Sequence, residues 1–283
     1  MGNRIGRKTV GVVALFLISR TFCSAQTRKD FRFNTSPGCV VLIDNDFGQV
    51  TVSPAQGEYV LVSTASKTDK PAISPLQSGN RIELRTRLPK HISAEDGSVD
   101  YQVRVPKDAT LTIRSVSGPV RISGLQGDVT AESESGEVEI SASRNAHVHV
   151  RTVEGPVTLT RLDNTFVDVT SIGGTVMLQD VSGPKVTINT GEGDIRYSGD
   201  LGRNGIYTFV NHSGNIIVML PPSASVDVSA HCLKGNIESD FPLSLSQQPS
   251  GAAQGKFLRG TSNSAASSLR ITSFLGNISL KKQ

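Results

Sequence analysis

The sequence contains no tryptophan, and aromatic residues make up only 5% of its 283 residues. Binding a sugar by ring stacking needs large aromatic side chains with exposed faces. The composition therefore disfavours a carbohydrate site built on stacked rings.

The sequence also lacks an apolar run of about 20 residues, the length that a membrane-spanning helix needs. It opens with the basic segment MGNRIGRK, followed by the apolar segment TVGVVALFLIS and the small residues Ser24 and Ala25. This order is typical of a secretory signal peptide over residues 1–25. A lipoprotein alternative would modify Cys23, but the large Phe22 before it disfavours that. We expect an exported protein, located in the periplasm, at the cell surface or outside the cell, that does not span a membrane after cleavage.

Positive charge is scarce once this segment is set aside. The chain has a formal net charge of +4, and the first 25 residues hold four basic residues and no acid. The remaining chain is therefore close to neutral. Because nucleic-acid binders carry an excess of basic residues, we expect no nucleic-acid partner.

A repeat dominates what is present. Glycines with similar neighbours recur every 18 to 21 residues, and the same pattern returns near the C-terminus. A fixed period near 20 residues indicates a solenoid, in which each repeat forms one coil. The structural glycines of this repeat are Gly118, Gly136, Gly155, Gly174, Gly193, Gly214, Gly235 and Gly276.

Apolar residues alternate with polar ones around each glycine. Val138 and Ile140 follow Gly136, and Val148 and Val150 precede Gly155. Alternation with a period of two predicts a strand with one face buried, so each coil supplies two short strands. Three residues before the glycines stands a column of small side chains, mostly hydroxyls, that can bond to nearby backbone groups in a turn.

These patterns predict an all-β fold, namely a single-stranded parallel β-solenoid, or β-helix, with coils of about 19–21 residues. The usual handedness of crossover connections favours a right-handed coil. We expect an N-terminal β segment with irregular first coils over 26–110 and regular coils over 111–243. A polar loop over 244–268 and a closing strand of the same solenoid over 269–283 follow. The segments 26–110 and 244–268 are the expected caps.

The cysteines have a geometric interpretation within this fold. Cys39 lies near the first coils and Cys232 in a late one. Six coils at about 4.8 Å separate them by about 30 Å, whereas a disulfide needs Cα atoms within about 7 Å. We expect both thiols to be unpaired.

The order of several segments resembles a bacterial "putative adhesin" family of secreted or envelope domains of unknown function. The matching segments are FGQVTV, YQVRVP, SVSGPVRI with its copy SESGEVEI, NHSGNIIV and GNISL, and the resemblance extends over about residues 40 to 283. The resemblance implies a β-helix-like fold and a non-catalytic role in adhesion.

Two clusters are candidate binding residues. The segment AESESGEVEI holds Glu132, Glu134, Glu137 and Glu139, and the segment AHVHV holds His147 and His149. The acids could hold a cation or form a carboxylate pair, and the two histidines point outward on one face if the valines point in. No third metal ligand is evident, so we expect no metal site and no cofactor.

The expected function is that of a non-catalytic secreted or envelope binding protein, an adhesin that presents a surface to a glycan, an envelope component or a protein. One alternative is a periplasmic envelope scaffold or stress-related component. A further alternative is a polysaccharide-active enzyme on a β-helix. That enzyme would need carboxylates in register on neighbouring coils, and the outward column after the glycines shows none.

Overall fold

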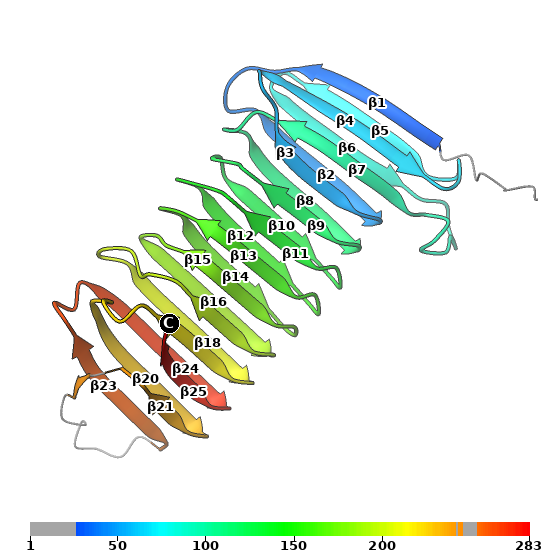
Figure 1. The fold of residues 1–283 in the computed structure, drawn as a ribbon. Helices are drawn as coiled ribbons and strands as arrows, with labels where there is room; N and C mark the ends of the chain where they lie inside the picture. The colour runs from blue at the N-terminus through cyan, green and yellow to red at the C-terminus, as the bar shows by residue number, and fades with distance from the viewer. Residues whose placement is uncertain (1–26, 242, 246–253) are drawn as a thin grey trace, which may run out of the picture.

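The computed structural model describes residues 27–241, 243–245 and 254–283, and all regular elements in these ranges are strands of two long sheets (Figure 1). The predicted signal peptide over residues 1–25 lies outside the described residues. Within the ranges that the structure describes, no helix has the length and apolar character to span a membrane.

The first sheet, here called sheet A, has 12 strands. Their spatial order is β1 (Thr27–Asn34), β4 (Tyr59–Ser66), β7 (Val99–Val105), β3 (Val50–Pro54), β9 (Val120–Ser123), β11 (Val138–Ser141), β13 (Val157–Leu162), β15 (Val176–Val181), β17 (Ile195–Ser198), β19 (Ile216–Leu220), β25 (Ile278–Lys282) and β21 (Ile237–Ser239).

The second sheet, sheet B, has 13 strands. Their spatial order is β22 (Ser244–Leu245), β23 (Lys256–Ser262), β20 (Val226–Lys234), β24 (Ser267–Leu275), β18 (Ile206–Ser213), β16 (Lys185–Glu192), β14 (Phe166–Ser171), β12 (His147–Thr152), β10 (Val129–Ser133), β8 (Thr110–Ser117), β2 (Val40–Phe47), β6 (Arg81–Arg87) and β5 (Ala72–Ser78).

Each coil gives one strand to each sheet, so the chain runs from β10 in sheet B to β11 in sheet A and on to β12. Parallel pairing keeps the repeats in register, with Val138 beside Val157 and Val157 beside Val176. All three valines are fully buried between the sheets. The structure confirms an all-β, solenoid-like stack with two strands per coil. Its single-stranded, right-handed course stays a prediction.

The coils do not stack in chain order at either end. The last pair of strands, β24 and β25, lies between the β18–β19 coil and the β20–β21 coil. The β6–β7 coil likewise lies outside the β2–β3 coil, which comes earlier in the sequence. The predicted closing strand is therefore the penultimate layer rather than the last. The two final coils share one residue pattern, so the pattern alone could not order them.

Antiparallel strands cover both ends of the stack. At the N-terminal end β4 pairs with β7, β1 with β4, and β5 with β6. At the C-terminal end β23 pairs with β20 and β22 with β23. The prediction of a polar loop over 244–268 is corrected here, because this range contains β22, β23 and the start of β24. A strand that caps a sheet edge bonds through its backbone and needs no apolar alternation.

The glycine column marks the closest approach between coils. An added Cβ at Gly136 or Gly155 would collide with the carbonyl of the corresponding glycine in the preceding layer, Gly118 or Gly136. Gly136 and Gly155 do not have a positive φ, so space rather than backbone conformation requires glycine there. Gly118 and Gly193 add a positive φ of 119° and 102° to the same constraint.

The small-residue column closes the same turns from inside, as predicted. The Ser133 hydroxyl donates to the Gly136 carbonyl at 2.9 Å, and Thr190 donates to the Glu192 carbonyl at 2.9 Å. The Asn211 amide donates to the Gly193 carbonyl at 2.8 Å. These bonds satisfy backbone carbonyl oxygens that, in the turn, have no partner in the sheet.

Cys232 occupies the same column, and its thiol donates to the Gly276 carbonyl. The structure confirms that Cys39 and Cys232 are free, and both are buried.

Replacing Gly155 with alanine should destabilise the fold by about 1–3 kcal/mol, since the methyl group must push two layers apart. Urea unfolding measures the change. Gly173→Ala is the matched control, because its Cβ would meet only the Val153 carbonyl at an ordinary 3.5 Å. Equal stability of the two variants would contradict the close-approach explanation.

The order of the last coils predicts which position reaches Cys232. Cys232 pairs in register with Ser273 of β24, whereas Asn211 lies beyond β24 on β18. A Ser273→Cys variant should therefore form a disulfide with Cys232 on oxidation, because neighbouring strands bring Cα atoms within about 7 Å. An Asn211→Cys variant should not. Peptide mapping under non-reducing conditions distinguishes the two, and a disulfide to Cys232 in the Asn211→Cys variant would show that the coils stack in chain order.

Candidate functional site

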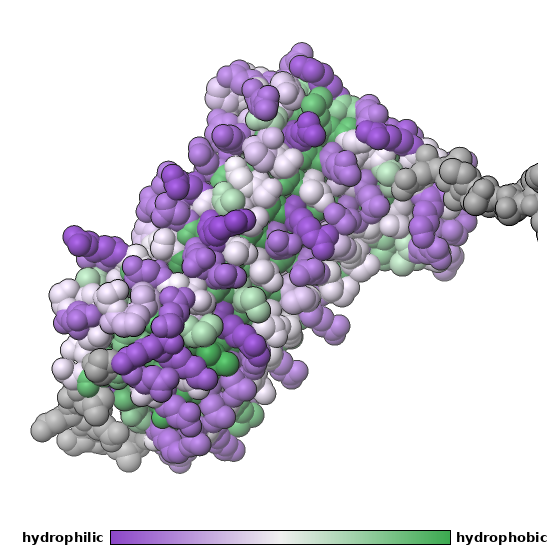
Figure 2. Space-filling model, in the orientation of Figure 1, coloured by the Kyte–Doolittle hydropathy of each residue, from purple (hydrophilic) through white to green (hydrophobic). Residues whose placement is uncertain are grey.

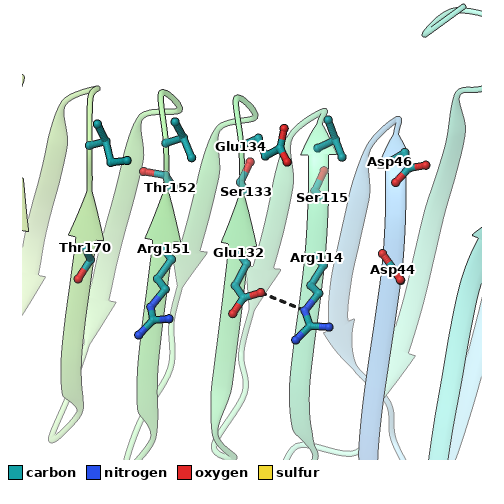
Figure 3. A pocket seen from close by; sticks show the side chains of 13 residues that line it. Asp44, Asp46, Arg114, Ser115, Glu132, Ser133, Glu134, Arg151, Thr152 and Thr170 are labelled. Atoms are coloured by element: carbon teal, nitrogen blue, oxygen red, sulfur yellow. Dashed lines mark hydrogen bonds and ion pairs between the residues drawn. The ribbon is translucent and has the colours of Figure 1, made fainter.

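A groove of about 500 Å³ crosses the outer face of sheet B over β2, β8, β10, β12 and β14 (Figure 3). Two rows of side chains line it, one on each side of the buried small-residue column. Figure 2 shows hydrophobic residues exposed among hydrophilic ones along the long axis of the molecule. Charged, acidic and apolar side chains converge in this groove, so we take it as the candidate site.

The first row, here called the charged row, stands four residues before each glycine. Strand register places Asp44, Arg114, Glu132 and Arg151 side by side on successive strands. The signs alternate along the row. The Arg114 guanidinium bonds to the Glu132 carboxylate at 3.0 Å, and both side chains are substantially exposed. Such a pair contributes little to stability.

The two charged residues that flank this central pair form no ion pair in the described part of the chain. Asp44 and Arg151 have no ion-pair partner among the described residues, and Arg151 is exposed. Their separation along the row spans three strand steps, or about 14 Å. They are therefore too far apart to pair with each other within one chain.

The second row, here called the mixed row, stands two residues before each glycine. It holds Asp46 on β2 and Val116 on β8, followed by Glu134, Val153 and Ile172 in the turns directly after β10, β12 and β14. Val153 and Ile172 are 41% and 63% exposed. Exposed apolar side chains next to one another on a polar surface are typical of an interaction site.

The acids in this part of the groove influence one another. Burial raises the pKa of Asp46 above its ordinary value, and the carboxylates of Asp44 and Glu134 raise it further. A carboxyl group with a raised pKa in a hollow is a recurrent feature of functional sites.

The structure divides the predicted acidic cluster between two faces. Glu132 and Glu134 line the groove. Glu137 and Glu139 lie on the sheet A side, 3.6 and 3.4 Å from the Arg121 guanidinium. The two pairs of acids do not combine into one site.

His147 and His149 project outward from sheet B, as predicted, but line a separate hollow of about 330 Å³. The Nδ1 atom of His147 lies 3.3 Å from Asp128, and that of His149 lies 3.5 Å from Asp168. Each imidazole faces its own carboxylate, and the ring of His147 packs edge-on against Phe166. Across the described residues, no group of three His, Cys, Asp or Glu side chains could hold a metal ion.

Sequence analysis missed most of the groove, including Asp44, Asp46, Arg114, Arg151 and Ile172. Glu132 and Glu134 stand out within one segment, whereas the column in which acids in register were expected, after each glycine, belongs to sheet A. The sequence does contain a pattern that locates the groove. The positions four and two residues before each glycine are aligned by the same register that aligns the glycines, so their side chains form rows.

The fold and this groove define a capped stack of β-coils with an open hollow across one sheet. A family model described as "Toastrack DUF4097" matches residues 41–281, and the chain belongs to this family. This match confirms the resemblance seen in the sequence. A search of curated proteins gives no match.

Two solved structures are similar to the chain. One is described as a putative cell adhesion protein from Clostridium sporogenes ATCC 15579, with 13% identity, a TM-score of 0.34, and coverage of 91% of this chain and 100% of that one. The other is described as a putative adhesin from Parabacteroides merdae ATCC 43184, with 9% identity, a TM-score of 0.37, and coverage of 90% and 96%.

The electrostatic coupling within the groove is testable. Glu134→Gln should lower the pKa of Asp46, because it removes one of the negative charges that raise it. Glu139→Gln, on the other face of the same coil, should leave that pKa unchanged. Carboxyl carbon NMR titration of Asp46 measures both, and equal effects of the two variants would contradict the assignment of Glu134 to the groove.

Proposed function

We propose that the protein is an exported, non-catalytic binding protein of the cell envelope or cell surface, an adhesin whose binding surface is the sheet B groove. One observation carries the proposal. The groove combines two charged side chains that form no ion pair with any described residue, Asp44 and Arg151, with two exposed apolar ones, Val153 and Ile172. The family match fits the fold and names neither a partner nor an activity.

The shape of the groove suits an extended partner. Its five strands span four steps of about 4.8 Å, or about 19 Å, along the stack. Parallel strands on a rigid, capped stack hold the side chains at fixed intervals, so the surface is preorganised and loses little conformational entropy on binding. A glycan chain, an envelope component or a protein segment could lie along it.

One observation favours an alternative, a polysaccharide hydrolase. Asp46 has a raised pKa beside Glu134, and glycoside hydrolases use one such protonated acid together with a second carboxylate. Asp46→Asn distinguishes the roles. Under our proposal neither the wild-type protein nor the Asp46→Asn variant releases reducing ends from purified envelope polysaccharide. Release of reducing ends that Asp46→Asn abolishes would establish the enzyme instead.

Location tests the first part of the proposal. A tagged copy should be found outside the cytoplasm on fractionation, and protease added to intact cells should remove the tag if the protein acts at the surface. A protected tag in the periplasmic fraction would contradict adhesion to an outside partner and favour the envelope scaffold. A cytoplasmic tag would contradict export altogether.

Binding tests the second part. Arg151→Glu and Ile172→Asp should each weaken binding of the purified protein to isolated envelopes by about tenfold or more, as expected for central interface residues. Arg104→Glu is the matched control, because Arg104 is an exposed arginine on the sheet A face. Equal loss with the control variant, or no loss with the groove variants, would place the binding surface elsewhere.

A further inference from the structure

We propose that the partner of the groove is a second copy of this chain, docked face to face on sheet B about a two-fold axis. The axis runs parallel to the strands and passes between β8 and β10. The inference rests on the proposed function, in that it uses the same groove, and it specifies which partner fills it.

The order of charges along the charged row carries the inference. From β2 to β12 the row reads Asp44, Arg114, Glu132, Arg151, which is negative, positive, negative, positive. A two-fold axis between Arg114 and Glu132 reverses the row of the second copy. It then sets Arg114 opposite the partner's Glu132, and Asp44 opposite the partner's Arg151. Each of these four charges meets the opposite charge, and the contact is the same from either copy. Arg85, which continues the row on β6, lies opposite the uncharged Thr170 of the second copy.

The two outer charges explain why a partner is needed. Within one chain the central pair is already bonded, whereas Asp44 and Arg151 have no ion-pair partner among the described residues. The two-fold axis lies midway between them, so docking gives each residue one counterpart, and the contact occurs twice in the dimer. Complementary charges that are fixed on rigid strands favour one register over others.

The mixed row is compatible with the same arrangement. Under this axis Val116 lies opposite the partner's Glu134, and Asp46 lies opposite the partner's Val153. No like charges meet in this row. Docking also shields Val153 and Ile172, which are 41% and 63% exposed in the single chain.

The size of the contact sets the expected affinity. The axis overlaps six strands of each copy, from β6 to β14, which span five steps of about 4.8 Å, or about 24 Å along the stack. With strands about 18 Å long, each copy buries about 430 Å², which is the size of a weak, transient interface. At the rim Glu83 of β6 lies opposite Asp168 of the second copy, and this repulsion lowers the affinity further. We therefore expect a reversible dimer that depends on concentration and weakens at high salt, because its contacts are ionic.

The test uses charge reversal in pairs, measured by sedimentation velocity over a concentration series of the purified protein. Arg151→Glu sets a carboxylate opposite the partner's Asp44, and Asp44→Arg sets a guanidinium opposite the partner's Arg151. Each single variant should weaken self-association about tenfold or more, since the altered contact occurs twice in the dimer. The combined variant should restore it.

Restoration is diagnostic because Asp44 and Arg151 are about 14 Å apart within one chain. Only contact between copies can make one reversal compensate for the other. Circular dichroism melts check that each variant folds. If a reversal impairs folding, the charge-neutralising variants Asp44→Asn and Arg151→Gln replace it, and each should weaken association by a smaller factor. Arg104→Glu, on the sheet A face, should leave association unchanged.

Several outcomes would overturn the inference. Single reversals that leave self-association intact, or a combined variant that fails to restore it, would rule out this two-fold contact. A wild-type protein that stays monomeric at all concentrations while binding envelopes would refute self-association but leave the proposed function standing. A monomer that also fails to bind envelopes would refute both.

Discussion

The close stacking of backbone at the glycine column is the constraint on which the structure depends. Neighbouring layers are separated by about 4.8 Å, and at Gly136 and Gly155 the carbonyl of one layer fills the space where a Cβ would lie in the next. The small-residue column fixes the same turn from inside through bonds such as Ser133 to Gly136. Because each turn closes in the same way, every outward position is also held in register, and rows of side chains form along the stack.

Those rows create the candidate site. Residues that are 18 or 19 positions apart in the sequence become neighbours on sheet B, so Arg114, Glu132 and Arg151 form one line. No single coil contains the groove, and no local motif encodes it. The site is a product of stacking, which also makes it rigid and suited to recognising a partner of fixed shape.

The sequence predicted the repeat, the alternating strands, the glycine and small-residue columns and the free cysteines, because each depends on a local pattern with a fixed period. It could not order the last two coils, since β20 and β24 present equivalent apolar and small residues to their neighbours. It also could not show that β23 of the C-terminal cap is a strand. This strand pairs with β20 through backbone hydrogen bonds and lacks the alternation of apolar and polar residues that marks the other strands. Glu132 and Glu134 were identified as candidates, but Glu137 and Glu139 lie on the other face, a division that depends on where the turn occurs.

The central claim is that sheet B, rather than sheet A, is the binding face. Hydroxyl-radical footprinting of the protein alone and in its bound state, with envelopes or at high protein concentration, tests it most directly. Ile172 of the groove is 63% exposed, and Met177 on the outer face of sheet A is 40% exposed, so both react in the free protein. The account predicts that binding lowers the oxidation of Ile172 and leaves that of Met177 unchanged. Protection of Met177 with continued oxidation of Ile172 would contradict it.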